Sequence, residues 1–319
     1  MVKNVNKREI EEVLLENKHN WDEMTTNVLI DYFYELSITI GSFVNVNNLL
    51  INFVKGDNLK NGIVYVEENL INNKYDAVYN YKDLCVRVAK SKRNNDYIKY
   101  IIFHELTHAL SKNSKGIGFY SCTGLNEGTT ELITMLRNNK IGYKFSNNGI
   151  YNIVTSLCYL LGYILGYSNM FDSYFYDEGK LKKLIEDKNM DYKEIATCLN
   201  YFLDQDEQFI DLKFDEDFIS FTRMIIYNFF DSFGEILNLD DFENKMKFIS
   251  LYINSPFSIN IADEYSTYIE IIMNKNNLLE LNYNEEEIDN ILKKYELYDI
   301  EKFAKYKKIN EEEFKEENN

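Results

Sequence analysis

The segment FHELTHALSK, residues 103–112, constrains the fold more than any other part of the sequence. It contains two of the three histidines of a 319-residue chain, four positions apart, with a glutamate directly after the first. Apolar residues recur with the helical period from Ile98 onward, which predicts a helix from about residue 94 to residue 111. On such a helix His104 and His108 lie one turn apart on the same side, about 6 Å from each other.

Two imidazoles at this spacing can bind one metal ion, and zinc suits them because it accepts nitrogen ligands from a tetrahedral site. Glu105 projects beside the histidines, where its carboxylate can accept a proton from the attacking water, so we expect it to be the general base. A catalytic zinc needs a third protein ligand, and Glu127 offers one in GLNEGTTELIT, residues 124–134. Glu131 follows one helical turn later, placed to accept the outer ring N–H of a ligand histidine.

HELTH and the downstream NEGTTE, with 18 residues between His108 and Glu127, resemble the zinc metallopeptidases called gluzincins, which include the thermolysin-like peptidases. The resemblance implies a two-lobed fold, with the active-site helix below a cleft between a mixed sheet and a helical lobe. It also implies that His104 and His108 are the zinc histidines and that Glu105 is the catalytic glutamate. Glu127 then corresponds to the third ligand, and Glu131 stands where that family has an acidic partner of a zinc histidine.

The order of the remaining elements predicts an α+β fold. Short runs of β-branched and aromatic residues predict three strands before the histidine helix, the last two forming a hairpin, and helices follow almost throughout. The expected strands are 62–67, 75–80 and 84–90, and the expected helices besides 94–111 are 5–16, 21–37, 125–138, 150–167, 180–188, 191–204, 215–233, 257–274 and 285–295. We therefore expect an N-terminal lobe, residues 1–113, with a small mixed sheet and the zinc helix, a mainly helical lobe, residues 114–305, carrying the third ligand, and an acidic tail, residues 306–319.

Composition narrows the classes of protein. The net charge of −17 argues against a nucleic-acid partner, which would need a basic surface. The first 20 residues do not resemble a secretory signal, so we expect a cytoplasmic protein. Four widely separated cysteines predict reduced thiols. The apolar stretch 150–167 contains polar residues and has no basic anchors at its ends, so it predicts a core helix rather than a membrane span.

These features favour a zinc-dependent peptidase that acts on a peptide or protein substrate. The alternatives are a zinc-holding regulatory or binding protein without turnover, and an effector or toxin peptidase with the same chemistry. A structural zinc site would need a fourth ligand, for which only Cys122 is near in sequence. Glu131 has two alternative roles, as a carboxylate on the helix surface or as a partner of Arg137 or a lysine.

The sequence departs from the resembled family in two respects. Thermolysin-like enzymes stabilise the oxyanion with a further histidine, which the C-terminal half lacks, so the donors considered are Tyr227, Tyr265, Tyr268 and Arg223. The chain also lacks the GxMEN stretch of the family's aminopeptidases, which favours an endopeptidase. By position, residues 75–80 are expected to form the strand edge that binds substrate, with residues 84–90 as the alternative.

Overall fold

The structure is a computed structural model. It describes residues 5–16, 21–71, 75–92, 97–141, 151–188, 190–209, 243–244, 246–247, 250 and 284–294. Contacts divide the chain into two compact units, which we describe separately. The first comprises Met1–Ser146 and Leu161–Leu184, and the second comprises Asn147–Leu160 and Ile185–Asn319.

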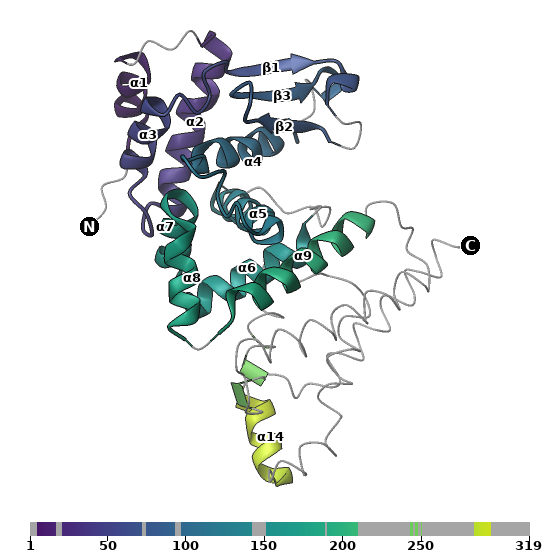
Figure 1. The fold of residues 1–319 in the computed structure, drawn as a ribbon. Helices are drawn as coiled ribbons and strands as arrows, with labels where there is room; N and C mark the ends of the chain where they lie inside the picture. The colour runs from purple at the N-terminus through teal and green to yellow at the C-terminus, as the bar shows by residue number, and fades with distance from the viewer. Residues whose placement is uncertain are drawn as a thin grey trace. The chain divides into compact units, whose positions relative to one another are not determined.

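Three helices that pack on one another begin the first unit (Figure 1). They are α1 (Lys7–Glu16), α2 (Glu23–Ile40) and α3 (Val46–Lys55). The first two confirm the predicted helices, whereas α3 was not predicted. Its ends carry ordinary signals, because the Asn45 side chain accepts a hydrogen bond from the Asn48 amide and Gly56 follows the last turn.

A three-stranded mixed sheet follows, as predicted. It consists of β1 (Ile63–Val66), β2 (Ala77–Asn80) and β3 (Cys85–Ala89) in the order β1-β3-β2. β1 is parallel to β3, and β2 is antiparallel to β3, which confirms the hairpin. β3 has a neighbour on both sides, so the alternative that residues 84–90 form a free edge is wrong, whereas β2 lies at the edge.

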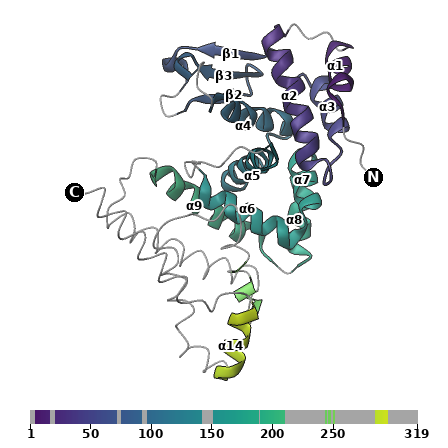
Figure 2. The ribbon, with the colours of Figure 1, turned by 180° about the vertical axis from the view of Figure 1, so that it is seen from behind.

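The helix that carries the histidines, α4 (Ile98–Ser111), packs against β2, β3 and the next helix, α5 (Thr123–Ile141) (Figures 1 and 2). The last turn of α4 is held by Asn58, whose side-chain amide donates to the carbonyl oxygens of Ala109 and Lys112 at 2.9 and 3.1 Å. The Ala109 carbonyl also accepts from the Lys112 amide at the end of the helix, so Asn58 adds a second donor there and supplies one to the Lys112 carbonyl. The predicted start of α4 at residue 94 lies outside the described residues.

The predicted helix 150–167 is in fact broken near its end. α6 (Asn152–Leu165) is followed by Gly166 with φ of 87°, a conformation that favours glycine, and α7 (Tyr167–Tyr176) begins directly after it. α7 was not predicted. In the first unit α7 contacts α4, and α8 (Glu178–Glu186) continues the chain. In the described parts of the chain, no helix is long and apolar enough to cross a membrane.

The described residues of the second unit are helical. α9 (Tyr192–Phe209) buries Ile195, Leu199 and Phe202, and α14 (Glu285–Lys294) is joined to Glu243 by an ion pair from Lys294. The α+β fold is thus confirmed, with one small mixed sheet and many helices. The helices predicted at 215–233 and 257–274 and the tail 306–319 lie outside the described residues, and the lobe boundary at residue 113 stays a prediction.

Candidate metal centre

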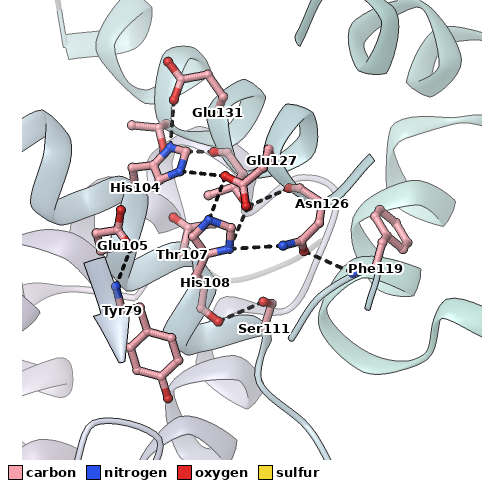
Figure 3. A network of polar contacts seen from close by, with 12 residues as sticks. Tyr79, His104, Glu105, Thr107, His108, Ser111, Phe119, Asn126, Glu127 and Glu131 are labelled. Carbon is pink, nitrogen blue, oxygen red and sulfur yellow. Dashed lines mark hydrogen bonds and ion pairs between the residues drawn. The ribbon is translucent and has the colours of Figure 1, made fainter. Parts of the chain in front are cut away.

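His104, His108 and Glu127 come together where α4 crosses the first turns of α5 (Figure 3). One potential ligand atom from each lies within 4.8 Å of the others. The Nε2 atoms of His104 and His108 lie 3.4 and 3.2 Å from the same oxygen, Oε2 of Glu127. Both histidines are buried, and Glu127 is half-buried. Among the described residues this is the group that could hold a metal ion, and it is the trio predicted from the sequence.

The distances from Glu127 to the two imidazoles fit a tetrahedral ion. Ligand atoms about 2.0 to 2.1 Å from a tetrahedral ion are separated from each other by about 3.3 to 3.4 Å. The distances of 3.4 and 3.2 Å from the two Nε2 atoms to Oε2 of Glu127 lie close to this value. The donor set of two imidazole nitrogens and one carboxylate oxygen is one that zinc accepts, and it leaves a fourth position open.

The glutamate and the two histidines shift one another's pKa values. Burial by itself would raise the pKa of Glu127, but His108 and His104 hold that pKa well below its usual range. Burial likewise opposes the charged form of His108, yet the Glu127 carboxylate raises the pKa of His108 above its ordinary value. A cation at this place would replace protons that the cluster otherwise retains.

Glu131 supports His104 from the far side of the ring. Its Oε2 lies 2.7 Å from Nδ1 of His104, and the Tyr100 hydroxyl donates to its Oε1. Glu131 is 3% exposed, so it is not the surface carboxylate of the alternative interpretation. Burial raises its pKa to about 8. Arg137, suggested as its partner, donates from Nε to Glu35.

His108 is supported differently. Its Nδ1 lies 3.3 Å from Oγ1 of Thr130 and 3.4 Å from Nδ2 of Asn126, both on α5. Thr130 in turn contacts the hydroxyl of Tyr174 on α7 at 2.6 Å. The partners of Nδ1 of His108 are therefore uncharged.

Glu105 stands beside the cluster and outside it. Its Oε2 accepts a hydrogen bond of 2.6 Å from the backbone N–H of Tyr79 on β2 (Figure 3). Burial raises the pKa of Glu105, although His104 and His108 oppose the shift. The expected base thus lies next to the two histidines without being part of the ligand trio.

The register of β2 shows which of its backbone groups point away from the sheet. The Ala89 amide donates to the Asp76 carbonyl, so the antiparallel pairs of Val78 with Arg87 and of Asn80 with Cys85 are the hydrogen-bonded ones. The N–H and C=O groups of Ala77 and Tyr79 therefore point away from β3. The backbone groups of Val78 are bonded inside the sheet. A proline at this position would therefore not test the edge.

The other expected residues have separate positions. The Cys122 sulfur accepts from the amide of Leu125 at the start of α5, and burial raises the pKa of this thiol to about 11. All four cysteines are described and are thiols rather than disulfides, as predicted. The proposed oxyanion donors Tyr227, Tyr265, Tyr268 and Arg223 lie outside the described residues.

Two tyrosines at the site were not predicted. Tyr100 precedes His104 by one helical turn, so the spacing on α4 could have identified it. Tyr174 comes from α7, and no local pattern connects it with the site.

Comparison with protein-family models, curated protein sequences and solved structures found no significant match to this chain.

Proposed function

We propose that this protein is a zinc-dependent endopeptidase of gluzincin type. The observation that carries the proposal is the combination of a three-residue ligand cluster with a separate half-buried glutamate, Glu105, beside it. A purely structural zinc site would close its fourth position with another ligand and would need no base. In the described residues the potential ligand group contains His104, His108 and Glu127, and Glu105 is bonded elsewhere.

In this proposal His104, His108 and Glu127 hold Zn²⁺. The ion would supply Lewis-acid polarisation of the scissile carbonyl and would lower the pKa of water. Glu105 would accept the proton of the attacking water and deliver it to the leaving amine. Burial raises the pKa of Glu105 toward neutrality, which suits a group that must first accept and then donate a proton.

The substrate is proposed to bind as an extended peptide along β2. An edge strand offers backbone donors and acceptors that pair with a peptide of varied sequence, as an endopeptidase requires. The outward N–H and C=O of Ala77 are the groups on offer, because the Tyr79 N–H is bonded to Glu105. Tyr79 thereby connects the substrate edge with the general base.

This edge can be tested with one proline substitution. Ala77→Pro removes an outward N–H and leaves the ladder bonds to β3 in place, so KM for a cleaved peptide should rise. Val78→Pro removes a bond inside the sheet and should instead lower the stability of the fold. If Ala77→Pro folds and cleaves with unchanged KM and kcat, β2 is not the substrate edge.

The proposed activity is tested by incubating the zinc-loaded protein with a diverse peptide mixture and mapping new termini by mass spectrometry. Glu105→Gln is the matched control, because the amide keeps the size of the side chain but cannot take up the proton. We expect internal cleavages with the wild type and almost none with Glu105→Gln at equal zinc content. Zinc binding without any difference between the two proteins would favour the zinc-holding protein without turnover.

A further inference from the structure

We infer that Thr130 and Tyr174 are positioning residues that fix the proton of His108 on Nδ1 and so keep its Nε2 free for a metal ion. The inference rests on the proposed metal centre and extends it to a helix, α7, that the resemblance and the ligand motif do not include. It is carried by the hydrogen bonds around one imidazole.

The direction of these hydrogen bonds can be worked out from one fixed donor. The Phe119 amide can only donate, and it donates to Oδ1 of Asn126 at 3.2 Å. The Asn126 amide group therefore turns its Nδ2 toward Nδ1 of His108, at 3.4 Å (Figure 3). When Nε2 of His108 binds a metal ion, as proposed, Nδ1 carries the ring proton, and the Asn126 Nδ2, being a donor, cannot accept it.

Thr130 is then the acceptor. Its hydroxyl donates to the carbonyl of Asn126 at 2.8 Å, which leaves the lone pairs of Oγ1 free. One lone pair faces Nδ1 of His108 at 3.3 Å, and the other faces the Tyr174 hydroxyl at 2.6 Å. Since the Thr130 proton is already used, Tyr174 donates to Thr130, and so does His108. The proton and both lone pairs of the Thr130 hydroxyl then each have a partner.

Nothing in this arrangement is left to rotate. Thr130 and Tyr174 are both completely buried, and the Tyr174 ring packs edge-on against Phe119 with centroids 5.3 Å apart. Gly118 has φ of 52°, and a Cβ placed on it would come within 2.5 Å of the Tyr174 ring. The loop before α5 therefore accommodates Tyr174 at close range, and α7 presents its hydroxyl to α5 in one position.

The chain contains a matched control for this pair. Tyr32 on α2 and Thr107 on α4 form the same kind of buried hydroxyl contact, at 3.0 Å, and Thr107 likewise donates to the carbonyl one turn earlier. Tyr32→Phe removes a tyrosine hydroxyl from a pair of the same kind as Tyr174→Phe does. Among the described hydrogen bonds, none joins Thr107 to an imidazole nitrogen. An effect of lost packing or stability alone would be similar in the two variants.

The experiment measures the zinc affinity of the full chain by competition with a chromophoric chelator, for the wild type, Thr130→Val, Thr130→Ser, Tyr174→Phe and Tyr32→Phe. We expect Thr130→Val to weaken zinc binding about tenfold, the lower end of the range for residues that orient a metal ligand. Tyr174→Phe should weaken it less, because Thr130 keeps its other bonds. Thr130→Ser and Tyr32→Phe should match the wild type.

A second readout does not depend on affinity or on folding of the variants. The chain has only three histidines, so its nitrogen NMR spectra contain few imidazole ring signals. The ring nitrogens of His108 can therefore be assigned in the zinc-loaded wild type. We expect its proton on Nδ1, slowly exchanging with water. A proton on Nε2 of His108 would overturn the inference. So would zinc affinities of Thr130→Val and Tyr174→Phe that equal the affinity of Tyr32→Phe. A wild type that binds no zinc would overturn the proposed metal centre as well, and that result is distinguished by the wild-type measurement alone.

Discussion

The two histidines of the candidate metal centre lie one turn apart on the same helix, yet their surroundings differ in charge. Behind His104, Nδ1 meets the buried carboxyl of Glu131, which also accepts from Tyr100. Behind His108, Nδ1 meets the hydroxyl of Thr130, which is held by Tyr174. A carboxylate makes an imidazole a stronger ligand through its charge, whereas a hydroxyl chiefly fixes the orientation and the tautomer.

The difference shows how the site distributes negative charge around a cation. Glu127 lies between the two imidazoles, Glu131 lies behind one of them, and Glu105 lies on the side of the sheet, while the side of α7 contributes no charge. Substitutions on the His104 side should therefore change metal affinity more than substitutions on the His108 side. The following predictions test this order, beginning with the group that both sides share.

Glu127→Ala removes the carboxylate that faces both Nε2 atoms, so it should reduce zinc affinity more than any change behind a histidine. The loss should exceed the factor of about 10 to 100 that is typical for residues supporting a ligand. Metal analysis after dialysis measures it, with Glu23→Ala, at an exposed position of α2, as the control. Wild-type affinity in Glu127→Ala would mean that the third ligand has been wrongly assigned.

Glu131→Gln keeps the shape and an acceptor oxygen for His104 but cannot ionise when a cation binds. We expect zinc affinity to fall by a factor of about 10 to 100, and by more than in Thr130→Val. The same chelator competition measures both variants. Equal losses would show that charge does not distinguish the two sides.

Tyr100→Phe removes the hydroxyl that donates to Glu131. It leaves the ring, which stacks on Tyr97 with centroids 5.0 Å apart. Loss of one hydrogen bond is worth about 0.5 to 1.5 kcal/mol, so affinity should fall about two- to tenfold. The effect should be smaller than that of Glu131→Gln. An effect as large as that of Glu131→Gln would show that Tyr100 does more than orient the carboxyl.

Asn58→Ala should leave the affinity of the folded protein for zinc almost unchanged and lower its stability. Two hydrogen bonds at the end of α4 are lost, although the Ala109 carbonyl keeps its bond from the Lys112 amide, at a cost of about 1 to 3 kcal/mol in the free energy of unfolding. Urea denaturation of the metal-free protein measures this cost. The control is Asn61→Ala, which removes an exposed bond to the Asp83 carbonyl. A strong loss of zinc affinity in Asn58→Ala would show that the end of α4 helps to form the site.

The trio could be predicted from the sequence because helix geometry fixes its spacing. His104 and His108 share a face of α4, and Glu127 and Glu131 share a face of α5, so one motif on each helix was enough. α3 could also have been found, since Val46, Leu49, Leu50 and Phe53 repeat with the helical period.

Other parts of the site depend on tertiary contacts. The bond from Tyr79 to Glu105 is made by a backbone amide, so it depends on the register of β2. It could not be predicted from the type of residue at position 79. Tyr174 is one of 26 tyrosines, and only the packing of α7 on α4 and the glycine at position 118 bring it to Thr130. Spacing within one helix therefore predicts ligands, whereas the groups that hold them require the fold.

The central claim is that one metal ion binds between α4 and α5, with Glu105 outside its ligands. The most direct test is anomalous diffraction at the zinc absorption edge from crystals of the zinc-loaded protein. The account predicts one peak per chain, about 2.0 to 2.2 Å from Nε2 of His104, Nε2 of His108 and a carboxylate oxygen of Glu127. A peak bonded to Glu105, Glu131 or Cys122, or no peak beside the two histidines at saturating zinc, would contradict it.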